Sequence, residues 1–151
     1  PKPKAATPPK RTPAGTSRRG TPPPREVRII GGEWRRTRVP VLDRPGLRPT
    51  PDRVRETLFN WLGQDLSGWR CLDAFAGTGV LGFEAASRGA AKVTMVDNHG
   101  PAVRQLEANR DKLKAEQVKM TTKVSLDDLF SQISEGQVKD LNIIVKARYQ
   151  K

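Results

Sequence analysis

The sequence contains few residues of several types, and each scarcity excludes a class of protein. One Cys among 151 residues excludes a disulfide framework, and one Cys with one His excludes a structural zinc site. No apolar run approaches the roughly 20 residues of a membrane helix, and no apolar stretch near the start resembles a signal-peptide core. Hydrophobic residues make up only 35%, so part of the chain is expected to remain unpacked. We therefore expect a cytoplasmic, soluble monomer without a metal and without membrane contact.

Positive charge is abundant and unevenly distributed. Residues 1–55 contain 15 Lys and Arg against 4 Asp and Glu, whereas residues 56–151 contain 13 against 12. Residues 1–25 hold seven basic residues, no acidic ones and eight of the 13 prolines. Proline blocks helix and ladder hydrogen bonds, and like charges repel. We interpret residues 1–25 as a disordered basic arm, which either binds RNA or acts as a solubilising tail.

Residues 26–63 are expected to form a basic hairpin and a capping helix. Val27–Ile30 predicts one strand and residues 33–41 a second, with Trp34 either stacking on a base or packing in the hairpin. Thr50 is expected to cap a helix that begins at Pro51. The helical spacing of its apolar residues predicts one core-facing side of that helix, formed by Val54, Leu58, Trp61 and Leu62.

Residues 64–151 alternate strand and helix patterns, which indicates a parallel sheet covered by helices on both faces. The expected strands are residues 70–75, 92–97, 118–122 and 141–145, and the expected helices are residues 80–88, 101–113 and 125–133. The fold class is therefore α/β.

A glycine-rich turn follows the first of these strands. Gly77, Gly79 and Gly82 fit a G-x-G-x-x-G pattern between a strand and a helix. Glycines there allow the backbone to turn tightly and to approach a ligand at the helix N-terminus. The pattern alone does not separate dinucleotide enzymes from other nucleotide-binding proteins.

Two acidic residues narrow the choice of ligand. Asp73 ends the strand before the turn, where a carboxylate would repel a pyrophosphate but attract a cation. Asp97 ends the next strand, where a carboxylate can accept both ribose hydroxyls of an adenosine. This pair favours S-adenosylmethionine over a nicotinamide cofactor. The alternative is that both acids cap loops and the glycines only pack.

At this point the sequence resembles a known family. Residues 27–35, 47–62 and 73–79 (VRIIGGEWR, LRPTPDRVRETLFNWL and DAFAGTG) are similar to the bacterial small-subunit ribosomal RNA guanine-N2 methyltransferases, the RsmD family. The resemblance covers residues 27–122. It implies a Rossmann-like methyltransferase fold, truncated at the C-terminus, that transfers a methyl group from S-adenosylmethionine to a guanine of small-subunit ribosomal RNA, free or in a ribosomal particle.

The resemblance also implies which residues bind which ligand. Residues expected to bind the cofactor are Arg48, Thr50, Asp73, Ala74, Phe75, Gly77, Thr78, Gly79, Asp97 and Asn98. Residues expected to face the RNA are Arg28, Arg35, Arg36 and Arg38. The family usually has Glu at the position of Asp97.

The C-terminal part departs from the family. The family has an Asn/Asp-Pro-Pro-Phe/Tyr motif after its fourth strand, which orients the target amine, and this sequence contains no such motif. No catalytic residue is therefore assigned, and we expect the chain to be inactive. Residues 124–147 resemble a segment of bacterial translation initiation factor two, so we interpret residues 123–151 as foreign. A non-enzymatic RNA- or ribosome-binding protein is the alternative function.

Overall fold

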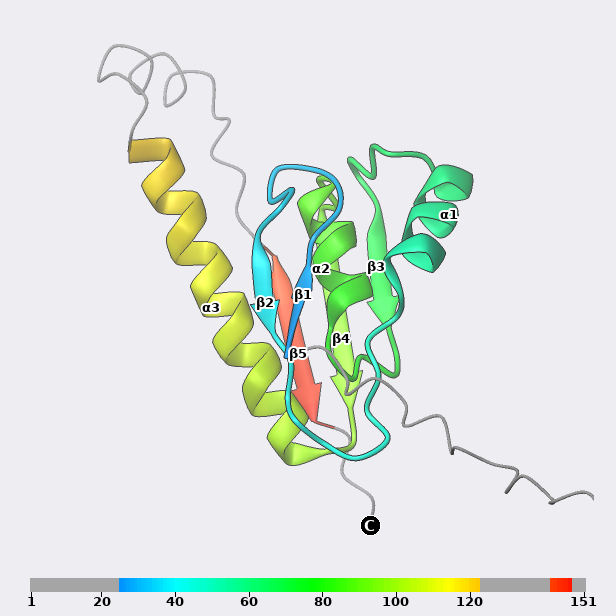
Figure 1. The fold of residues 1–151 in the computed structure, drawn as a ribbon. Coiled ribbons are helices and arrows are strands. Elements are labelled where there is room, and N and C mark those ends of the chain that lie inside the picture. The colour runs from blue at the N-terminus through cyan, green and yellow to red at the C-terminus, as the bar shows by residue number, and fades with distance from the viewer. Residues whose placement is uncertain (1–24, 123–141, 148–151) are drawn as a thin grey trace, which may run out of the picture.

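A computed structural model describes residues 25–122 and 142–147 (Figure 1). The predicted arm falls outside these residues except for Arg25. The elements in chain order are β1 (Glu26–Arg28), β2 (Arg38–Pro40), α1 (Asp52–Leu62), β3 (Arg70–Asp73), α2 (Val80–Ser87), β4 (Lys92–Asp97), α3 (Gly100–Thr122) and β5 (Ile143–Ala147). Within the described residues, no helix is long and apolar enough to cross a membrane.

The central sheet is parallel, as its sequence pattern predicts. Its strand order is β3-β4-β5, and Cys71, Val93 and Ile143 lie side by side in the register. The side chains of these three residues lie on one face of the sheet. On that face, Val93 and Met95 of β4 and Ile143 of β5 belong to the main hydrophobic core. A side chain points to the opposite face at every second position of a strand. This periodicity fixes one apolar face of the sheet.

The described helices α2 and α3 both pack on that buried face. A Cβ atom added at Gly82 of α2 would lie 2.6 Å from Met95 Sδ, and one added at Gly79 would lie 2.2 Å from Leu106 Cδ2 of α3. On the opposite face, Leu72 of the edge strand β3 is 69% exposed. The sequence predicts helices on both faces of the sheet, and within the described residues α2 and α3 cover one of these faces.

The β1–β2 hairpin is antiparallel, with Val27 opposite Val39 and Arg28 opposite Arg38. The second strand is shorter than predicted, because residues 31–36 form turns and bends instead of extended chain. Trp34 is only 2% exposed and belongs to the main core. It packs in the hairpin, and the alternative of stacking on a base is wrong in this structure.

Helix α1 begins one residue later than predicted and buries a different face. Pro51 is the N-cap residue and Thr50 makes no capping hydrogen bond. Arg55 and Phe59 are the buried residues of α1, whereas Val54 and Trp61 are exposed. The prediction of a core Trp61 is wrong, since this side chain is 81% exposed. The face that docks is chosen by a polar contact, described below.

Helix α3 is longer than predicted. Residues 118–122, expected to form a strand, continue the helix to Thr122. Val103, Leu106 and Leu113 point inward as expected. The predicted helix 125–133 lies outside the described residues. The predicted last strand is present as β5, which pairs in parallel with β4.

Candidate functional site

The glycine-rich turn joins the end of β3 to the start of α2. Ala76 N donates to Val96 O (3.0 Å), and Gly77 N donates to Asp97 Oδ2 (2.8 Å). Gly77 and Gly79 have φ angles of 52° and 74°, in the left-handed region that glycine adopts without strain. The turn is thus held to β4 on one side, and α2 starts directly after it.

Gly79 and Gly82 serve close packing as well as turning. A side chain at Gly79 would collide with Leu106 and Phe83 and would lie in tight contact with Met95. One at Gly82 would collide with Met95. The pattern therefore combines backbone geometry at the turn with tight contact between α2 and the sheet, the two uses of glycine in nucleotide-binding turns.

Asp73 ends β3 beside this turn. Burial raises the pKa of its carboxyl group, and the nearby Asp97 raises the pKa further. Hydrogen bonds from the backbone N–H groups of Gly82 and Phe75 act in the opposite direction. A half-buried carboxylate with a raised pKa is stabilised by a cation, so this position favours a positively charged ligand group.

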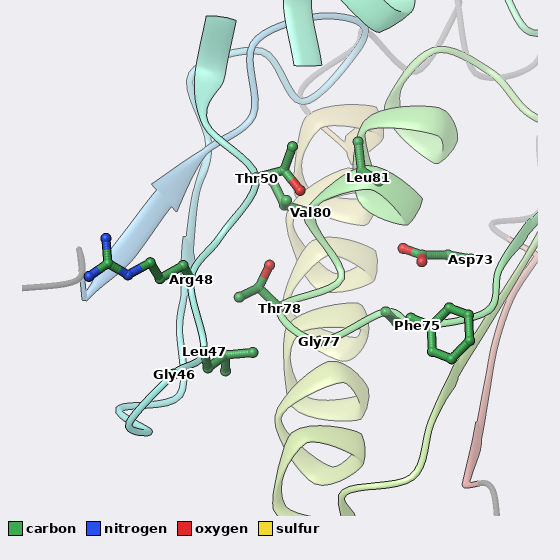
Figure 2. A pocket seen from close by; sticks show the side chains of 11 residues that line it. Gly46, Leu47, Arg48, Thr50, Asp73, Phe75, Gly77, Thr78, Val80 and Leu81 are labelled. Carbon is green, nitrogen blue, oxygen red and sulfur yellow. The ribbon is translucent and has the colours of Figure 1, made fainter. Parts of the chain in front are cut away.

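A cavity of about 190 Å³ lies between the turn and the loop that precedes α1. Figure 2 shows the Asp73 carboxylate pointing toward this space, whereas the Arg48 guanidinium extends away from it. Predicted cofactor-binding residues that line the cavity are Arg48, Thr50, Asp73, Phe75, Gly77 and Thr78. Residues that line it without having been predicted are Gly46, Leu47, Ala76, Val80 and Leu81. Only their position next to the predicted motifs could have indicated them.

Four predicted cofactor-binding residues, Ala74, Gly79, Asp97 and Asn98, do not line this cavity. Asp97 instead binds the backbone: its Oδ2 accepts from Gly77 N, and its Oδ1 accepts from His99 N (2.8 Å). Each carboxylate oxygen has a second lone pair, so Asp97 can still accept hydrogen bonds from a ligand. His99 is a loop residue whose Nδ1 accepts from Ala102 N (3.3 Å) at the start of α3.

The four arginines predicted to face RNA lie on the hairpin and are all exposed. Arg28 and Arg38 are direct neighbours across the two strands. Each has an exposed acidic partner: Arg28 pairs with Asp52 (3.5 Å) and Arg38 with Glu26 (3.6 Å). Arg35 and Arg36 lie in the loop between the strands, and Arg36 has a φ angle of 74°.

Comparisons with known proteins agree with this architecture. Ribosomal RNA small subunit methyltransferase D of Escherichia coli K12 is 54% identical over 90 residues, which are 60% of this chain and 46% of that protein. The Haemophilus influenzae protein of the same name is 52% identical over 106 residues, or 69% and 55% of the two chains. A solved Escherichia coli structure described as a putative methyltransferase matches with a TM-score of 0.54 at 49% identity, covering 60% of this chain and 48% of that one.

The chain spans about half the length of these curated relatives. Translation initiation factor IF-2 of Desulfitobacterium hafniense is 44% identical over 71 residues, which are 47% of this chain and 7% of that protein. This match agrees with the resemblance found for residues 124–147. The described end of that segment, β5, nevertheless serves as a strand of the sheet.

A family model described as Conserved hypothetical protein 95 matches residues 27–145, from the hairpin to β5. The match includes the glycine-rich turn, both acidic strand ends and the third strand of the sheet. The chain belongs to this family, whose members among the curated proteins include the ribosomal RNA small subunit methyltransferases D.

Proposed function

We propose that this chain provides the cofactor-binding half of an S-adenosylmethionine-dependent methyltransferase of small-subunit ribosomal RNA. The names of its relatives support the substrate, and the resemblance of residues 47–62 to the guanine-N2 enzymes supports the exocyclic amine of a guanine as the target. When bound, S-adenosylmethionine supplies an electrophilic methyl group. The residues of the chain bind, orient and enclose the reactants.

The observation that carries the proposal is the position of Asp73. Its carboxylate is half-buried, has a raised pKa and points into a cavity formed by a glycine-rich turn. A pyrophosphate would be repelled there, whereas the ammonium group of S-adenosylmethionine would form a charge-assisted hydrogen bond. The donor set of the cavity thus fits this cofactor better than it fits a nicotinamide dinucleotide.

The remaining cofactor contacts are assigned by their place around the turn. Asp97 would accept a ribose hydroxyl with its free lone pairs while it continues to hold Gly77. Gly77 and Thr78 would lie along the methionine end, with Ala74 and Phe75 beside it, and Asn98 would lie near the adenine. Arg48 and Thr50, in the loop before α1, would close the cavity from the opposite side.

The RNA would contact the hairpin. Arg28, Arg35, Arg36 and Arg38 are exposed on one small element, and guanidinium groups bind phosphate oxygens in a bidentate manner. Such binding releases counterions, so we expect the affinity to fall steeply with salt. The basic arm, residues 1–25, would extend this electrostatic surface.

Calorimetric titration with S-adenosylmethionine tests the cofactor site. Loss of one charge-assisted hydrogen bond costs about 1.5–3 kcal/mol, so Asp73→Ala and Asp97→Ala should each weaken binding about ten- to a hundredfold. Thr57→Ala, on the exposed surface of α1, is the control and should leave the affinity unchanged. Binding that survives both Asp variants, or stronger binding of NADH than of S-adenosylmethionine, would contradict the proposal.

Methyl transfer itself needs the target nitrogen to be aimed at the methyl carbon. The 151 residues include no Asn/Asp-Pro-Pro-Phe/Tyr sequence, and after β5 they read Arg-Tyr-Gln-Lys. We therefore expect this polypeptide to transfer no labelled methyl group to small-subunit RNA above background. Robust turnover by the homogeneous polypeptide would show that another group orients the amine.

A non-enzymatic RNA-binding protein is the second candidate, and the exposed arginines on the hairpin favour it. The same titration separates the two, because a protein that only binds RNA would not bind S-adenosylmethionine. RNA binding without any cofactor binding would support this second function.

A further inference from the structure

The loop between β1 and β2, residues 29–37, has a fixed backbone. Ile29 N donates to Thr37 O (2.9 Å), and Arg36 N donates to Ile29 O (2.8 Å). Inside this ring, Thr37 N donates to Trp34 O (2.9 Å). A loop closed by its own hydrogen bonds presents its exposed side chains, here Arg35 and Arg36, from defined positions.

Two side chains of α2 hold this loop. Glu84 accepts from Ile30 N with Oε1 (2.8 Å) and from Gly31 N with Oε2 (3.4 Å). Ser87 Oγ donates to Gly31 O (2.6 Å) and accepts from Trp34 N (2.9 Å). Together they bind the buried side of the loop through its backbone.

The backbone of the loop lies in close contact with the last residues of α2 and with Arg88. A Cβ atom at position 32 would lie 1.9 Å from Ser87 O, and one at position 31 would lie 2.4 Å from Arg88 Nη2. The two consecutive glycines therefore allow the loop backbone to lie directly against α2. Trp34 is buried beneath it.

Buried cations hold the Glu84 carboxylate in place. Glu84 is 0% exposed, and it forms ion pairs with Arg88, the C-cap residue of α2, and with Arg55 Nη1 of α1 (3.5 Å). Arg88 also lies over the Phe59 ring, 4.1 Å from its centroid. The acceptor that holds the loop is itself fixed from two sides.

The same short helix starts at the glycine-rich turn. Residues Val80–Ser87 follow Gly79 directly, and an eight-residue α-helix is about 12 Å long. The candidate cofactor turn thus precedes the start of α2, and the arginine loop is bound toward its end, where Figure 1 shows the connection between β1 and β2.

We propose that Glu84 and Ser87 are positioning residues, which place Arg35 and Arg36 at a set distance from the cofactor turn so that α2 acts as a spacer between the methyl donor and the RNA phosphates. This inference rests on the proposed function. A guanidinium on a preorganised loop loses less conformational freedom on binding a phosphate than one on a mobile loop. A substitution that loosens the loop should therefore weaken the binding of RNA and leave the affinity for S-adenosylmethionine unchanged.

The test is a double-mutant cycle on binding to in-vitro transcribed small-subunit ribosomal RNA. Replacing Arg35 and Arg36 together by Ala should lower the log–log salt slope of binding by about 2, since each arginine contributes one phosphate contact. Ser87→Ala alone should lower it by about 1 to 2. In the background without both arginines, Ser87→Ala should change nothing further, because it acts through them.

Asn109→Ala is the matched control. Asn109 is also buried, and its Nδ2 donates to Pro40 O (3.0 Å) at the far end of β2, away from the arginine loop. It should lower stability to a similar extent and leave the salt slope unchanged. The affinity of Ser87→Ala for S-adenosylmethionine should stay within twofold of the parent.

A folded Ser87→Ala protein with the parental salt slope would overturn the inference, as would an effect that adds to that of the arginines. If thermal melting shows that Ser87→Ala does not fold, Ser87→Cys keeps a side chain of the same shape with a weaker hydrogen-bonding group and is read in the same way. No effect of the arginine replacements themselves would instead refute the RNA surface of the proposed function.

Discussion

The two ends of α2 are built in opposite ways. At its start, Gly79 has a left-handed backbone, no side chain caps the helix, and the candidate cofactor cavity lies beside it. Toward its end, Glu84, Ser87 and Arg88 are buried and bind the hairpin, α1 or one another. The first end borders the candidate cofactor cavity, whereas the second uses its polar groups for contacts inside the protein.

This difference shows how the N-terminal elements become part of the fold. Buried polar contacts attach the hairpin and α1 to one end of α2, which packs on the sheet. The main hydrophobic core also includes Ile29, Trp34 and Phe59. Replacing one partner of such a bond leaves a buried charge or donor without compensation, which is costly. Substitutions at the two ends should therefore differ in size and in kind.

Among substitutions at the two ends of α2, Glu84→Gln should have the largest effect. It leaves Arg55 and Arg88 buried without their shared counter-charge, and breaking a buried pair typically costs about 3–5 kcal/mol. Urea unfolding followed by tryptophan fluorescence measures the loss. Glu56→Gln on the exposed side of α1 is the control and should stay within about 0.5 kcal/mol of the parent. Equal stability of the two variants would remove the contrast between the ends.

Gly79→Ala tests the open end. Its φ angle of 74° costs an alanine about 1–2 kcal/mol, and the collision with Leu106 adds an overpacking cost, so we expect a total of about 2–4 kcal/mol. Gly46→Ala is matched to it, because Gly46 has a φ angle of 83° but no atom near its absent Cβ. It should lose only the backbone term. The same loss in both variants would show that packing at the turn contributes nothing.

The charge of Asp73 gives the open end a pH dependence. Burial raises its pKa, so acidification should begin to weaken S-adenosylmethionine binding above the ordinary Asp range. Without ligand the sign is reversed: the folded state holds this proton more firmly, so stability falls as pH rises through the raised pKa. Asp73→Asn should lose about 1.5–3 kcal/mol of binding energy and remove both dependences. Calorimetry at several pH values checks this, and an unchanged pH profile in Asp73→Asn would assign the effect to another group.

Trp61→Ala should have the smallest effect. Trp61 is 81% exposed on the side of α1 that faces away from the buried end of α2, so its removal should change stability by less than about 0.5 kcal/mol. Trp34→Ala, which empties a buried site, should cost about 3–5 kcal/mol. Thermal melting of both variants compares them. A large loss for Trp61→Ala would mean that α1 docks through its apolar stripe after all.

The glycine-rich turn and its flanking elements could be predicted because their signals are local. A strand pattern, three spaced glycines and a helix pattern follow one another within residues 70–88, and the structure places β3, the turn and α2 there. The alternation of strand and helix likewise predicted parallel pairing. By contrast, residues 118–122 have a weak strand pattern, but they follow a long helix and continue it.

The sequence by itself determined the three strands of the sheet with the helices that follow the first two, the acids at two strand ends and the concentration of positive charge before residue 56. Only the tertiary structure decided which side of α1 is buried and where Trp34 points. Periodicity marks an apolar stripe at Val54 and Trp61, yet α1 turns Arg55 inward, because Glu84 on α2 is a buried anion that needs a cation. That requirement links residues 29 positions apart, so no local pattern along the chain could reveal it.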